Sequence, residues 1–133
     1  MQLSMARKQT VPSSRVHAGV TAYHAGIAAE ISVARHYERS GFTICAQRWR
    51  GTGGEIDLVA KAGEVVVFIE VKQSRTFALA AQHLTDRQMK RIYQSASEYL
   101  AQEPAGLDTN VRFDVALVDF LGQIEIIEQA FMA

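Results

Sequence analysis

Apolar positions along the chain predict one helix, three strands, a second helix and two further strands. In the first helix the apolar residues recur at helical spacing, and they are Ile27, Ile31, Ala34 and Tyr37. Gly41 follows as a natural C-terminal stop. The strands are shorter apolar or alternating runs. They cover residues 42–47, 54–60, 65–72, 111–120 and 124–128.

The second helix is predicted to begin after a loop of residues 74–84. Thr85 and Gln88 have the spacing of a capping box, which marks a helix start. The apolar face of this helix comprises Met89, Ile92, Tyr93, Ala96 and Leu100. Pro104 and Gly106 end it. A strand, a crossover helix and a strand imply parallel pairing with a right-handed crossover, so we expect a mixed sheet with element order αβββαββ.

The hairpin formed by the second and third strands has charged residues on one face. A two-residue turn at 63–64, with glycine first as type II′ prefers, fixes its register. Asp57 then lies opposite Glu70, and Glu55 lies opposite Lys72. Because side chains alternate along a strand, these four share one face. The opposite, apolar face is expected to hold Ile56, Leu58, Ala60, Val67, Ile69 and Val71.

The charged face has two interpretations. Many antiparallel hairpins simply expose a polar face to water. However, residues 65–69 are apolar on both faces, which is typical of a central strand, and Glu70 and Lys72 come at its end. Two carboxylates in such a place repel unless a cation lies between them. Oxygen ligands favour Mg²⁺ or Mn²⁺, and a nearby lysine can assist an attacking water, so the set suits phosphodiester hydrolysis.

These motifs resemble known families. Asp57 and the run Glu70-Val71-Lys72 resemble the D…(D/E)xK signature of the restriction-endonuclease-like nuclease superfamily. Four segments resemble, in order and spacing, the YraN-like family of small bacterial proteins, and they are residues 26–30 (GIAAE), 54–60 (GEIDLVA), 68–72 (FIEVK) and 112–115 (RFDV). The resemblance extends from about residue 22 to the C-terminus.

The resemblance implies an α/β, three-layer αβα restriction-endonuclease-like fold, similar to that of archaeal Holliday-junction resolvases. It also implies that Asp57 and Glu70 hold the metal, with Lys72 beside it and Glu30 approaching from the first helix. By its position alone, Glu30 is better explained as a residue at the margin of the apolar stripe, and the resemblance is what favours a functional role. Glu55, facing Lys72, is a supporting candidate. The chain departs from the family in having no proline before Asp57 and in having Gln73-Ser74-Arg75 after Lys72.

A glycine-rich loop precedes the acid-bearing strand and contains Arg48, Trp49 and Arg50. Arginines beside a tryptophan suit phosphate contacts and base stacking. The alternative is that Trp49 packs in the core while the arginines only solubilise the loop.

Further cations follow the hairpin and begin the second helix, at Arg75, Arg87, Lys90 and Arg91. Cations near a helix start oppose the dipole preference for acids, which suggests an anionic partner such as nucleic acid. An ordinary solvated helix face is the alternative.

Composition limits the protein class. The chain has 133 residues with 14 Lys plus Arg and 14 Asp plus Glu, so no global field attracts nucleic acid or membrane. We expect one domain at residues 21–133 after a flexible tail at 1–20, with no membrane segment. The single cysteine, Cys45, fits a reducing cytoplasm. The histidines lack ligand spacing, which argues against zinc.

The leading hypothesis is therefore a cytoplasmic, Mg²⁺- or Mn²⁺-dependent endonuclease that hydrolyses nucleic-acid phosphodiesters. DNA is favoured over RNA, with branched or repair DNA as the candidate substrate. The main alternative is a non-catalytic nucleic-acid-binding accessory module, and a weaker one is a protein-interaction module. A homodimer would be needed to cut both strands of a duplex symmetrically.

Overall fold

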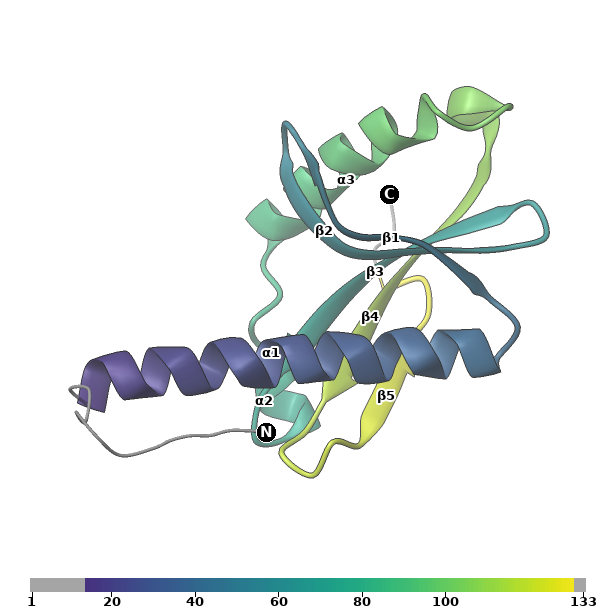
Figure 1. Ribbon diagram of the computed structural model, residues 1–133. Helices are drawn as coiled ribbons and strands as arrows, with labels where there is room; N and C mark the ends of the chain where they lie inside the picture. The colour runs from purple at the N-terminus through teal and green to yellow at the C-terminus, as the bar shows by residue number, and fades with distance from the viewer. Residues whose placement is uncertain (1–13, 131–133) are drawn as a thin grey trace.

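The computed structural model describes residues 14–130, which form one sheet with helices on both faces (Figure 1). Its elements are α1 (Ser14–Arg39), β1 (Thr43–Gly51), β2 (Gly54–Ala62), β3 (Val65–Gln73), α2 (Phe77–Ala81), α3 (Asp86–Leu100), the 3₁₀ turn η1 (Gly106–Asp108), β4 (Asn110–Val118) and β5 (Ile124–Ile127). The predicted helices and strands are all present. One further helix, α2, lies in the segment expected to be a loop.

The sheet is mixed, as predicted. Its strand order is β1-β2-β3-β4-β5, in which only β3 and β4 run parallel. The connection between these two parallel strands contains α2, α3 and η1. The predicted β2–β3 register holds from the turn as far as one pair, with Ala62 opposite Val65 and Leu58 opposite Ile69. The expected pairs Asp57–Glu70 and Glu55–Lys72 lie beyond the paired part of the hairpin, and Glu55 is instead opposite Arg50 of β1. Gly63 has a φ of +59°, as the first turn position of a type II′ hairpin requires.

Two apolar layers hold the helices to the sheet. Between α1 and one face, the buried residues are Ala29, Val33, Ala34, Tyr37, Leu58, Ala60, Val67, Ile69, Ala116 and Val118. Between α3 and the other face, they are Ile56, Val59, Val66, Phe68, Ala96, Tyr99 and Leu100. A third cluster joins α2, α3 and β4. The protein is therefore a three-layer α/β fold, consistent with the restriction-endonuclease-like architecture.

The first helix differs from its prediction in two ways. It begins at Ser14, inside the segment expected to be a tail, while residues 1–13 lie outside the described part of the chain. The buried stripe also includes Ala29 and Val33, whereas Ile31 is exposed. The side of the helix that faces the sheet is decided by how its side chains pack on the strands, and apolar spacing alone does not reveal this.

The second predicted helix is confirmed in its start and its buried face. The Thr85 hydroxyl oxygen accepts a hydrogen bond from the Gln88 backbone N–H at 3.1 Å. Ile92, Ala96 and Leu100 are buried as expected. Ser95 and Tyr99 are buried as well, because β1 and the β1–β2 turn also pack on this helix.

The β1–β2 turn leaves no room for a side chain at Gly53. A Cβ there would clash with the Arg91 carbonyl oxygen and lie 2.9 Å from Gln94 Cβ. Gly53→Ala is therefore expected to destabilise the protein by about 1–3 kcal/mol, because the backbone of α3 would have to move.

Gly26, inside α1, has open space around it, since a Cβ added there would meet no atom within 4 Å. Gly26→Ala should stabilise by about 0.5–1 kcal/mol through helix propensity. Urea unfolding measures the change in the free energy of unfolding, which should be a decrease for Gly53→Ala and an increase for Gly26→Ala. Equal changes in the two variants would contradict this account.

Candidate active site

The candidate site lies where β2 and β3 stop pairing and separate, at the end of the hairpin remote from its turn. Regular pairing of the two strands ends at Leu58 and Ile69. Beyond this pair, the Val71 backbone N–H donates to Asp57 Oδ2 at 2.8 Å. A side-chain carboxylate thus takes over the role of a backbone carbonyl, and the strands can separate while Val71 keeps an acceptor.

An irregularity in β1 accompanies the separation. Arg48 has a φ of +51°, which is uncommon for a residue other than glycine, and the β1–β2 register passes directly from Gln47–Leu58 to Trp49–Ile56. Strict alternation predicts Ile56 on the same face as Leu58, and this is wrong. Ile56 packs in the α3 layer while Leu58 packs in the α1 layer. The backbone rotates between them, next to Asp57.

The separated strands line an open cleft of about 500 Å³ between the two helical layers. Its lining residues are Gly26, Ala29 and Glu30 from α1, Glu55 and Asp57 from β2, Glu70, Val71, Lys72 and Gln73 from β3, and Gln88 from α3. All the residues that the sequence proposed for catalysis or its support therefore lie in one cleft.

The two oxygens of Glu70 have different surroundings. Oε2 accepts a hydrogen bond from Gln88 Nε2 at 2.6 Å and lies 3.1 Å from Lys72 Nζ. Oε1 is buried and has no hydrogen-bond partner. Burial, followed by the charge of Asp57, raises the pKa of Glu70 to about 8. The pKa of Asp57 is also raised, mainly by burial. The two carboxylates are thus buried close together, so ionising both of them costs free energy.

Glu30 lies on the α1 side of the cleft. Its Oε1 accepts from Arg48 Nε at 2.9 Å, an ion pair that fixes the irregular segment of β1 against α1. Burial raises the pKa of Glu30, and the Arg48 hydrogen bond opposes that rise. Glu55 pairs with Arg50 at 3.4 Å, on the more exposed side.

The donor set fits a hard divalent cation. Glu70 Oε1 is a buried acceptor with an unused lone pair, and Asp57 supplies a second carboxylate in the same cleft. Among the side chains that the structure describes, no group of three or more His, Cys, Asp or Glu is placed to hold a metal. Mg²⁺ suits such a site, because it commonly binds through one or two carboxylates and keeps several waters.

The raised pKa of Glu70 predicts a pH-dependent stability. An acid whose pKa is higher in the folded protein binds its proton more tightly there, so stability falls as pH rises. For Glu70 the fall should begin near its ordinary pKa of 4.5 and be complete above about 8. Unfolding in EDTA across this range should show it, and Glu70→Gln should flatten the profile. A profile of the wild type that Glu70→Gln leaves unchanged would contradict the assignment.

The residues expected to contact nucleic acid are more scattered. Arg48, Trp49 and Arg50 belong to β1 itself, which extends to Gly51, rather than to a loop. Trp49 is partly buried and packs edge-on against Tyr99, with ring centroids 5.4 Å apart. The four other residues expected to contact nucleic acid are exposed, namely Arg75, Arg87, Lys90 and Arg91.

Gln88 and Gln73 are cleft residues that the sequence did not assign to the site. Gln88 was interpreted only as part of the helix cap, and its backbone N–H does serve there. Its side chain instead reaches Glu70. The capping spacing explains the helix start, but no local pattern predicts a contact with a strand residue 18 positions away.

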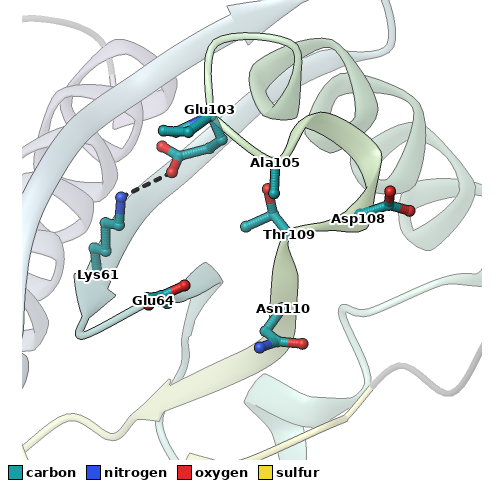
Figure 2. Close-up of a pocket in the computed structure, with 8 residues that line it drawn as sticks. Lys61, Glu64, Glu103, Ala105, Asp108, Thr109 and Asn110 are labelled. Atoms are coloured by element: carbon teal, nitrogen blue, oxygen red, sulfur yellow. Dashed lines mark hydrogen bonds and ion pairs between the residues drawn. The ribbon is translucent and has the colours of Figure 1, made fainter.

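A second hollow, of about 200 Å³, lies at the opposite end of the hairpin (Figure 2). There Lys61 Nζ pairs with Glu103 Oε1 at 2.8 Å, while Glu64 and Asp108 are exposed. Every buried polar side-chain atom described in this hollow has a hydrogen-bond partner. Its charges are explained by pairing and solvation, in contrast to those of the cleft.

Comparison with known proteins places the chain in a family. Residues 29–118 match the profile of the group described as "Uncharacterised protein family UPF0102". The chain belongs to the UPF0102 family. The matched region contains α1 from Ala29, the hairpin and β4, and so includes Glu30, Asp57, Glu70 and Lys72. The expected YraN-like membership is thereby supported.

Several UPF0102 proteins are close relatives. One from Cereibacter sphaeroides is 60% identical over 115 residues, covering 86% of this chain and 98% of its own. One from Ruegeria pomeroyi is 58% identical over 113 residues, covering 85% and 92%. One from Roseobacter denitrificans is 53% identical over 118 residues, covering 89% and 92%. The names of these relatives give the family and no activity.

Within residues 14–130, no helix combines the length and the apolar composition that crossing a membrane requires.

Proposed function

We propose that this UPF0102 protein is a metal-dependent nuclease that hydrolyses phosphodiester bonds of nucleic acid, DNA rather than RNA. One observation carries the proposal: Glu70 presents a buried, unpartnered oxygen beside Asp57, with Lys72 at the same carboxylate, in an open cleft. The resemblance to the D…(D/E)xK signature and the α/β fold support it. Nucleic acid as partner and Mg²⁺ or Mn²⁺ as cofactor are parts of this proposal.

Asp57 and Glu70 would hold the metal, through the carboxylates that face the cleft. When bound, the ion would lower the pKa of a coordinated water and neutralise charge on the phosphate. Glu70 is kept in orientation by Gln88 and Lys72, which both contact Oε2 and leave Oε1 available.

Lys72 is suited to act on the phosphate or on the attacking water. Its side chain is mostly buried, and its ammonium is anchored to Glu70 at 3.1 Å. An ammonium held in this way stabilises negative charge developing nearby without having to be reoriented. Glu30 and Glu55 line the cleft, where they fix the two β1 arginines and add negative charge.

The binding-only alternative also has an observation in its favour. No third carboxylate of the described residues completes a three-ligand metal group. A protein of this kind would bind nucleic acid in the cleft and use a metal, if at all, for docking.

A cleavage assay separates the two functions. Purified protein is incubated with labelled single-stranded, duplex, flapped and four-way-junction DNA and with RNA, in Mg²⁺, Mn²⁺ or EDTA. We expect cutting of at least one DNA substrate in Mg²⁺ or Mn²⁺ and none in EDTA. Binding that is insensitive to metal, without cutting of any substrate, would replace the nuclease with the accessory module.

A further inference from the structure

The turn between β4 and β5 presents two large apolar side chains to solvent. Phe120 is 71% exposed and Leu121 is 68% exposed. Single exposed apolar residues are common on protein surfaces, but here two are adjacent on one turn.

Hydrogen bonds fix the backbone of this turn. Asp119 Oδ1 accepts from Leu121 N–H at 3.0 Å and from Gln123 N–H at 2.8 Å. The Phe120 N–H donates to the Arg75 carbonyl oxygen at 3.4 Å, which ties the turn to the segment after β3. A turn held in this way loses little conformational entropy when it binds a partner.

The turn also forms one wall of a groove that continues into the candidate cleft. The groove has a volume of about 180 Å³, and α1 forms its other wall. It is lined by Ala25, Ala28, Ala29, Ser32, Gln73, Val118, Asp119, Phe120 and Gly122. Ala29 and Gln73 line both this groove and the cleft that holds Glu70. A strand whose phosphate enters the cleft would therefore pass next to the turn.

We propose that Phe120, supported by Leu121, stacks on an unpaired base of the nucleic acid bound in the cleft. The inference rests on the proposed function and specifies its substrate class, namely nucleic acid with unpaired bases such as a fork, flap or single strand. In a perfect duplex the bases are stacked on one another, and no base face is free to meet Phe120.

The geometry favours a base over a second copy of the chain. Two side chains provide far less than the roughly 800 Å² that each partner buries in a typical stable interface. The groove is smaller than the ~300–1,000 Å³ typical of pockets for drug-sized ligands, so it suits a single ring system. Exposed Arg75, bonded through its backbone to Phe120, provides a cation for the adjoining phosphate. The carboxylate of Asp119 is engaged with backbone N–H groups of the turn.

The test measures binding in EDTA, where a metal-dependent nuclease does not cut. The probes are a forked DNA with 2-aminopurine in its unpaired arm and a duplex of the same length. Phe120→Ala should weaken binding to the fork by about 5- to 150-fold and abolish the fluorescence change, because one stacked base is lost. Phe120→Trp should retain both signals, while Phe120→Leu should lose the fluorescence change. Leu107→Ala is the control and should leave both signals unchanged, since Leu107 is 73% exposed but lies on η1, away from the turn.

Each failure has a distinct pattern. If the protein cuts DNA but Phe120→Ala binds fork and duplex as the wild type does, the stacking proposal is wrong and the nuclease stands. If neither probe binds and no substrate is cut, both fail. If Phe120→Ala converts a sedimenting dimer into a monomer without changing fork binding, the turn is an interface between copies instead.

Discussion

Asp57→Asn is expected to abolish metal-dependent cleavage, lowering its rate by about 10²-fold or more, as removal of one key electrostatic group does in other enzymes. Asparagine can still accept the Val71 N–H through its amide oxygen, so the local separation of β2 and β3 should persist. The substitution removes a charge that would bind the cation, while the shape of the side chain is nearly unchanged.

The same substitution should not destabilise the metal-free protein. The charge of Asp57 is one cause of the raised pKa of Glu70, after burial. Removing this charge lowers the pKa of Glu70 and reduces the cost of ionising it. In EDTA above pH 8, Asp57→Asn should therefore be at least as stable as the wild type. The variant would then lose activity without losing stability, as is common at active sites.

Asp108→Asn is the matched control, because Asp108 is exposed at the opposite end of the hairpin. Single-turnover cleavage and thermal unfolding of the wild type and both variants show whether Asp57 acts in catalysis or in folding. Full cleavage by Asp57→Asn would remove Asp57 from the metal site. Loss of cleavage together with loss of folding would assign Asp57 a structural role.

Asp114→Ala is expected to cause the largest loss of stability of any single substitution considered for this chain. Asp114 is 0% exposed and lies on β4. It accepts from the Tyr37 hydroxyl at 2.7 Å and from Arg112 Nε and Nη2, each at 2.9 Å. The Gln129 backbone N–H lies 3.3 Å away. One carboxylate thus joins α1, β4 and the segment after β5.

Removal of this carboxylate leaves the buried Tyr37 hydroxyl without its acceptor and leaves Arg112 with only the exposed Glu128, 3.6 Å away. Breaking a buried ion pair in this way costs about 3–5 kcal/mol. That is a large part of the ~5–15 kcal/mol typical of a folded domain, and it corresponds to a Tm lower by roughly 10–20 °C. Calorimetry of Asp114→Ala beside Asp108→Ala measures the difference. Similar Tm values for the two variants would show that the Asp114 network contributes nothing.

The strands and helices could largely be predicted because their patterns are local. The hairpin register follows from a two-residue turn, and the start of α3 follows from Thr85 and Gln88. The predictions failed where alternation or helical spacing is broken by packing. Ile56 changed face at the irregular Arg48 segment, Ile31 was exposed, and α2 formed within the expected loop because Thr76 caps it and Ala80 is buried.

The sequence by itself determined the α/β class, the family and the set of acids and lysine on one hairpin, since turn chemistry and period-two alternation act over a few residues. Only the tertiary structure decided that Gln88 and Lys72 share one oxygen of Glu70 and leave the other buried without a partner. It also decided that Tyr37 reaches Asp114, 77 positions away, and that the Phe120 turn adjoins the cleft. These contacts depend on the positions of the helices on the twisted sheet. Those positions are set by the packing of whole layers and not by any short run of residues.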